Sequence, residues 1–142
     1  MKAGVPSLLL VDDDPIDMQA IRRSLRVLRI DNPVIEARDG VEALQHLRGE
    51  NGHDRVPSPR LVLLDLNMPR MGGMEFLEEV RRDSGLRPTL VFVMTTSASE
   101  DDKARAYARN VAGYVLKQQP GRPFLETIRT LERYWRTLEF PV

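Results

Sequence analysis

Residues 61–76, LVLLDLNMPRMGGMEF, predict a buried strand, a sharp change of direction and the start of a helix. The stretch begins with four consecutive apolar residues, which lack the alternation of a strand with one face in water. A short continuous apolar run with a turn behind it is typical of a central strand buried on both faces. Proline and paired glycines then break the strand, and helical spacing of apolar residues follows at Phe76, Leu77 and Val80.

Asp65 stands at the carboxyl end of this run and is the candidate reactive group. About eight residues separate Asp65 from the predicted helix, so it is badly placed to cap that helix. A carboxylate in this position is free at the edge of the sheet where open α/β folds bind their ligands.

Other apolar runs predict four more strands, at residues 7–11, 33–37, 89–94 and 113–116. Helices are predicted over 15–30, after Asp39-Gly40, around 76–80, over 100–109 and over 124–138, with a polar surface loop at 49–59. Five strands alternating with five helices predict an α/β fold, with a parallel sheet, right-handed crossovers and helices on both faces.

Length and composition narrow the class of protein. At 142 residues the chain is expected to be one domain, and its 21 basic residues balance its 21 acidic ones, so nothing global favours nucleic acid or membrane. There is no cysteine for disulfides or thiolate metal sites, and no apolar run approaches the ~20 residues of a membrane span. We therefore expect a soluble, cytoplasmic protein.

Three aspartates follow the first predicted strand. Asp14 precedes Pro15, and proline is favoured at the first position of a helix, so N-capping explains Asp14. It leaves Asp12 and Asp13 unexplained.

The carboxyl ends of parallel strands share one edge of the sheet, where we expect Asp12, Asp13, Asp65, Thr95 and Lys117. Neighbouring carboxylates repel, and at least one would stay protonated unless a cation intervened. Oxygen ligands in this number suit Mg²⁺. A hydroxyl and an ammonium are what a phosphoryl group needs on its remaining oxygens.

With these motifs the sequence resembles a response-regulator receiver domain of two-component signalling, of the CheY-like kind. The resemblance rests on the acidic residues of LLLVDDD, the phosphoacceptor motif LVLLDLNMPRMGG, the threonine of VFVMTTS and the lysine of GYVLK, and it covers about residues 7–138. It implies a doubly wound, flavodoxin-like sheet of five parallel strands in the order 2-1-3-4-5 with five helices.

The resemblance also implies the chemistry of the site. Asp65 would accept a phosphoryl group from the phosphohistidine of a sensor histidine kinase. Mg²⁺ would be held by Asp13, Asp65 and the Asn67 carbonyl, with Asp12 supporting it through water.

Further roles are implied for three residues near the phosphoacceptor. Thr95 and Lys117 would hold the phosphoryl oxygens, and the rotamer of Tyr114 would follow Thr95. The protein would not be an enzyme in the usual sense, but a phosphoacceptor that catalyses its own phosphotransfer and autodephosphorylation.

TTSASEDD, the long loop before the central strand and ERYWRTLEFP resemble one subgroup, the free-standing regulators paired with phytochrome-type histidine kinases. A single receiver domain over residues 1–142 with no output domain is therefore expected. Its output would pass through protein contacts or onward phosphotransfer, with no nucleic acid and no membrane as partner.

Two positions depart from the common pattern of receivers. Thr96 stands where alanine or another small residue is more usual, and its bulk is expected to narrow access to the acyl phosphate. Gln118 follows Lys117 where many relatives have proline, often after a cis bond. A cis bond before another residue costs about 2.5–4 kcal/mol, which argues against that geometry here.

Two other functions fit parts of the sequence. A haloacid-dehalogenase-type phosphatase would use Asp12 as nucleophile, but it would need an acidic pair after the lysine strand, where Gln118-Gln119 stands, and would leave Asp65 idle. A receiver-shaped interaction module that is never phosphorylated would typically have lost one of the acids, and none is lost here.

Two surfaces are candidates for protein contacts. The first predicted helix carries a second apolar stripe opposite its core face, at Ile16, Ala20, Arg23, Val27 and Ile30. This stripe either packs beside the last helix or docks on the kinase. The last helix, with Tyr134 at its edge and an apolar tail at 140–142, is expected to form a homodimer.

Overall fold

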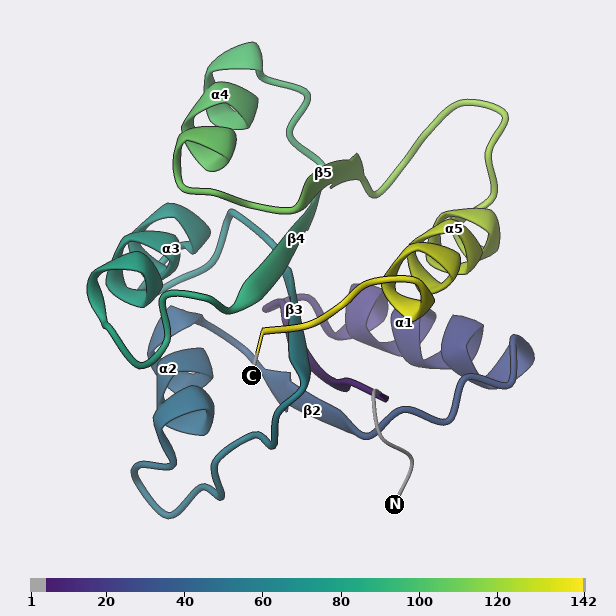
Figure 1. Ribbon diagram of the computed structural model, residues 1–142. Helices are drawn as coiled ribbons and strands as arrows, with labels where there is room; N and C mark the ends of the chain where they lie inside the picture. The colour runs from purple at the N-terminus through teal and green to yellow at the C-terminus, as the bar shows by residue number, and fades with distance from the viewer. Residues whose placement is uncertain (1–4, 142) are drawn as a thin grey trace.

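The computed structural model describes residues 5–141, which form five strands and five helices (Figure 1). The strands are β1 (Ser7–Val11), β2 (Val34–Ala37), β3 (Arg60–Leu64), β4 (Leu90–Thr95) and β5 (Gly113–Leu116). The helices are α1 (Pro15–Val27), α2 (Gly40–Arg48), α3 (Gly73–Arg82), α4 (Glu100–Ala108) and α5 (Phe124–Arg136). All strand pairs are parallel and the order is β2-β1-β3-β4-β5, which confirms the predicted fold.

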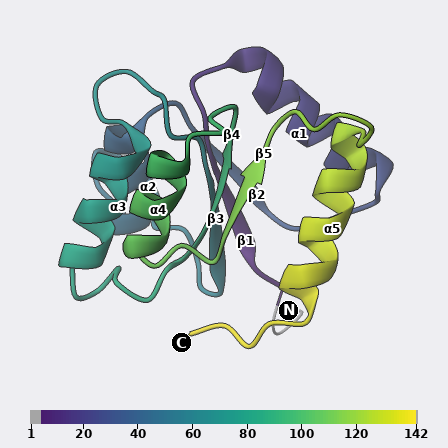
Figure 2. The same ribbon diagram turned by 90° about the horizontal axis from the view of Figure 1, so that it is seen from above.

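Helices α1 and α5 cover one face of the sheet and α2, α3 and α4 cover the other (Figure 2). Successive residues of a strand point to opposite faces. In β3, Leu61 and Leu63 therefore join the core under α1 and α5, whereas Val62 and Leu64 join the core under α2 and α3. Both faces are buried, which is the physical reason for the unbroken apolar run in the sequence.

The start of α1 follows the sequence prediction, but its end does not. Asp14 caps the helix by accepting a hydrogen bond from the Ile16 backbone nitrogen at 2.9 Å. The helix ends at Val27 rather than near Ile30, because Arg29 takes a left-handed conformation with φ of 57°. The reversed chain lets the Ile30 nitrogen reach the Leu25 carbonyl at 2.9 Å, so Ile30 packs against the core.

The end of the chain also differs from the prediction. Helix α5 stops at Arg136, so Leu138 lies beyond the helix rather than in it. Leu138 and Phe140 fold back as partly buried side chains against the core between the sheet and α1 and α5. Val142, which was expected to prolong the apolar tail, lies outside the described residues.

Two backbone features complete the fold. Across residues 5–141 the single cis peptide bond is Ser58–Pro59, so Lys117–Gln118 is trans, as the energetic argument against a cis bond indicates. None of the helices in the described part of the chain is long and apolar enough to cross a membrane.

Candidate functional site at the carboxyl end of the sheet

Three aspartates meet where β1 and β3 end. Val11 pairs with Leu64 in the parallel register, so the residues that follow, Asp12 and Asp65, are neighbours. Together with Asp13, they place carboxylate oxygens within 4.8 Å of one another. Asp12 and Asp65 are buried and Asp13 is exposed, so the cluster is open to solvent on one side.

Lys117 reaches this cluster from the end of β5. Its Nζ donates to Asp12 Oδ2 at 2.7 Å and lies 3.6 Å from Asp65 Oδ2. It also donates at 2.7 Å to Asp17 Oδ2, a partner that was not predicted. Asp17 sits in the first turn of α1, where the helix dipole already explains an acidic residue, so the sequence offered no separate signal for this contact.

Burial disfavours the charged forms of the acids and of Lys117 at this site, whereas their mutual attraction favours those forms. Burial raises the pKa of Asp65, and repulsion from Asp12 adds to the rise, although Lys117 opposes it. Burial likewise raises the pKa of Asp12 despite its hydrogen bond from Lys117. Burial works against the charge of Lys117, but its aspartate partners outweigh that effect and raise the pKa of the ammonium. One lysine therefore does not fully compensate the buried carboxylates, and the cluster favours a further positive charge.

Thr95 and Tyr114 are linked through the segment that follows β4. Thr95 is fully buried at the last position of β4, and its hydroxyl oxygen accepts from the Ser97 nitrogen at 3.3 Å. The Tyr114 hydroxyl donates to the Ser97 carbonyl at 2.8 Å. Tyr114 is partly buried against the core, so Ser97, which lies between β4 and α4, links Tyr114 to Thr95.

The loop between β3 and α3 holds its shape through glycine and one ion pair. A Cβ on Gly73 would lie 2.7 Å from the Asp65 carbonyl oxygen, so glycine is required there. Arg70, with φ of 60°, donates through Nε and Nη2 to the Asp39 carboxylate at 2.7 and 3.2 Å. Burial of Asp39 opposes ionisation, but Arg70 outweighs it and lowers the pKa of Asp39. Asp39 is also the N-cap of α2, and its ion pair with Arg70 was not predicted.

Two remaining residues named by the sequence analysis lie at the mouth of the site. Asn67 is exposed, two positions beyond Asp65 in the same loop. Thr96 is exposed directly after the buried Thr95. Both positions leave their side chains facing solvent rather than the core.

The arrangement is suited to one kind of chemistry. Clustered carboxylate oxygens are the ligands of hard divalent cations, and a buried ammonium beside them can stabilise an anionic group. Residues 8–129 match the response regulator receiver domain family, so the chain belongs to this family.

Known members of the family are similar to the chain over most of its length. Response regulator Rcp1 from Synechocystis is 33% identical over 128 residues, which are 90% of this chain and 87% of Rcp1. A crystal structure of the Mn²⁺-bound form of Rcp1 has a TM-score of 0.86 at 32% identity and covers 96% of this chain and 99% of that one. The phosphorylated cyanobacterial phytochrome response regulator RcpA has a TM-score of 0.87 at 31% identity, with coverage of 96% and 99%.

Proposed function

We propose that this protein is a stand-alone response regulator that accepts a phosphoryl group from the phosphohistidine of a sensor histidine kinase onto Asp65. The observation that carries the proposal is the convergence of Asp65 with Asp12, Asp13 and Lys117 at one edge of the sheet. An Asp65 oxygen would attack phosphorus as the phosphorus–nitrogen bond breaks and the imidazole leaves.

The metal proposed for this site is Mg²⁺. Asp12, Asp13 and Asp65 provide the oxygen cluster, and the Asn67 carbonyl would complete the protein ligands. Burial raises the pKa values of Asp12 and Asp65, and a bound cation would offset that cost of ionisation. The Mn²⁺-bound form of Rcp1 supports a divalent cation here. Bound Mg²⁺ would neutralise the charge that builds on the phosphoryl oxygens.

Lys117 and Thr95 would hold the phosphoryl group. Lys117 is already directed at Asp65 by Asp12 and Asp17, so it needs little rearrangement to reach a phosphoryl oxygen on Asp65. The Thr95 hydroxyl now accepts from the Ser97 nitrogen, and a turn toward the phosphoryl group would alter that contact. Tyr114, bonded to Ser97, would then report the change at the surface near α4. Hydrolysis of the acyl phosphate would reset the protein.

Labelling with acetyl phosphate and Mg²⁺, followed by intact mass, tests this function. The wild type is expected to gain one phosphoryl group. Asp65→Asn should gain none, because the shape is kept but the nucleophile is lost. Asp101→Asn, which alters an exposed acid of α4, is the matched control and should label normally. Labelling of Asp65→Asn at the wild-type rate would contradict the proposal, and rapid turnover without a stable product would favour the phosphatase.

The kinase is proposed to dock on α1. Ile16 and Val27 are 74% and 61% exposed, so this apolar stripe does not pack beside α5. Ile30 lies past the helix and against the core, and therefore does not belong to the stripe. The similarity to RcpA, a phytochrome response regulator, supports a phytochrome-type kinase. Neither nucleic acid nor membrane is proposed as a partner, so output would pass to another protein.

A homodimer on α5 is also proposed, with a smaller surface than the sequence predicts. Tyr134 is 48% exposed and meets Phe92 edge-to-face with ring centroids 5.5 Å apart. Leu138 and Phe140 are packed on the protein's own core, so they offer less apolar area to a partner. Light scattering of the wild type and Tyr134→Glu, with and without beryllofluoride and Mg²⁺, checks this. A wild-type monomer at tens of micromolar in both conditions would contradict the dimer.

A further inference from the structure

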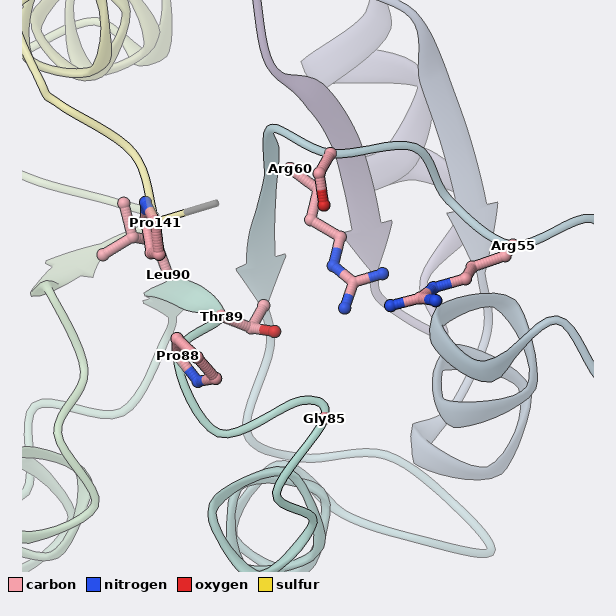
Figure 3. A pocket seen from close by; sticks show the side chains of 8 residues that line it. Arg55, Arg60, Gly85, Pro88, Thr89, Leu90 and Pro141 are labelled. Carbon is pink, nitrogen blue, oxygen red and sulfur yellow. The ribbon is translucent and has the colours of Figure 1, made fainter.

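A small cavity lies at the amino-terminal ends of β3 and β4, at the opposite end of the sheet from Asp65 (Figure 3). Its volume is about 120 Å³, and it is lined by Arg55, Ser58, Arg60, Gly85, Pro88, Thr89, Leu90 and Pro141. Among the described residues the lining contains no carboxylate, and its polar side chains are guanidinium groups and hydroxyls. Every polar side chain on this wall can therefore donate a hydrogen bond.

Arg60 is the buried member of the group. Only 8% of it is exposed, and its Nη1 donates to the carbonyls of Val56 at 3.2 Å and Leu47 at 3.4 Å. Within residues 5–141 it has no carboxylate within ion-pair distance. A buried guanidinium is normally paired with an anion, because taking the charge out of water is costly.

Arg55 and Thr89 face the same space. Figure 3 shows the guanidinium groups of Arg55 and Arg60 extended toward one another, and the Thr89 hydroxyl turned into the cavity. Burial lowers the pKa of Arg60, and repulsion from Arg55 lowers it further. Thr89 is only 7% exposed, and its hydroxyl lines the cavity beside the two arginines. Two like charges and a hydroxyl thus surround one small space.

We propose that this cavity binds a small phosphate, either inorganic phosphate or the phosphoryl end of a phosphorylated metabolite. A dianion would match the two guanidinium charges, and its oxygens could accept from both arginines and from Thr89 and Ser58. A carboxylate offers fewer oxygens than the site has donors. The cavity is well below the roughly 300–1,000 Å³ of sites for drug-sized ligands, which excludes a buried nucleotide.

The site is separate from the proposed phosphorylation chemistry. Residues of the cavity stand at the beginning of β3 and β4, whereas Asp65 and Thr95 stand where these strands end. Binding here should therefore need neither Mg²⁺ nor Asp65. This independence lets an experiment separate the two sites.

A titration of the whole protein with inorganic phosphate, in EDTA and at constant ionic strength, tests the proposal. The readouts are the amide NMR shifts of Gly85, Thr89 and Leu90. We expect saturation with a Kd of about 1 mM or tighter. Glycerol phosphate in a second arm distinguishes a free phosphate from a phosphorylated metabolite, and acetate in a third tests for a carboxylate.

Variants locate the binding. Arg55→Met removes an exposed side chain and Thr89→Val keeps the shape of the threonine, and each should weaken binding about tenfold through the lost hydrogen bonds. Arg133→Met, on the exposed side of α5, and Asp65→Asn should bind as the wild type does. Shifts that do not saturate, equal affinity in Arg55→Met, or saturation by acetate but not phosphate would each overturn the proposal.

Discussion

The two ends of the sheet solve the problem of a buried charge in different ways. At the carboxyl end, Lys117 is buried among Asp12, Asp17 and Asp65, so opposite charges compensate within the protein. At the amino-terminal end, the partners of the buried Arg60 among residues 5–141 are two carbonyl oxygens, and Arg55 faces it. The first end has too much negative charge and the second too much positive charge. This difference agrees with the cation and phosphoryl group proposed for one end and with the anion proposed for the other.

Removing the central cation from each end should have unequal effects. Lys117→Met leaves buried carboxylates without their partner and should lower the free energy of unfolding by about 3–5 kcal/mol in the absence of metal. Arg60→Met loses two hydrogen bonds to carbonyls but also relieves repulsion, so we expect a loss of only about 1–2 kcal/mol. Urea denaturation in EDTA measures both.

Addition of Mg²⁺ should affect the stability of the two variants differently. The metal should restore part of the stability of Lys117→Met, because it binds the same carboxylates, and should leave Arg60→Met unchanged. Equal losses in the two variants, or equal recovery with Mg²⁺, would show that charge compensation does not distinguish the two ends.

The proposed docking of the kinase allows a second comparison, between the two ends of α1. Ile16 is at the start of α1, next to the aspartates, whereas Val27 is at its far end. Since the kinase must bring its phosphohistidine to Asp65, Ile16→Asn should slow transfer from the kinase about tenfold, or about 1.4 kcal/mol, and Val27→Asn less. Labelling by acetyl phosphate should be normal in both variants, and a parallel loss there would indicate a folding defect instead.

The smallest effect is expected on the stability of Asp65→Asn, which removes the charge of the proposed nucleophile. Burial raises the pKa of Asp65, so the folded protein favours the protonated carboxyl group. The stability that this preference contributes is fully present below the unfolded pKa of about 3.8. It is lost as pH rises through the folded pKa. Asp65→Asn should therefore be more stable than the wild type at neutral pH in EDTA, with the advantage shrinking as pH falls. Thermal melts from pH 4 to pH 8 measure it. A variant that is less stable at neutral pH would contradict the assigned cause.

The sequence by itself determined the layers and the proximity of the acids, whereas the strand order came from the resemblance to receiver domains. Unbroken apolar runs at Leu61 and elsewhere require a sheet buried on both faces, and a parallel sheet brings all strand ends to one edge. Caps such as Asp14 are equally local, because the hydrogen bond spans only two residues. The layers, the shared edge of the strand ends and the helix caps follow from patterns within one element or from a general rule of topology.

Contacts between distant segments were decided only by the tertiary structure. Asp17 and Lys117 are 100 residues apart, and Arg70 and Asp39 are 31 apart, so no local pattern links them. The left-handed Arg29 that ends α1 and the folding back of Phe140 depend on which part of the core is open to them. The same holds for Thr89, which lines one cavity with Arg55 and Arg60 because β3 and β4 start side by side. The partner of a side chain depends on the position of its backbone, and that position is a property of the whole fold.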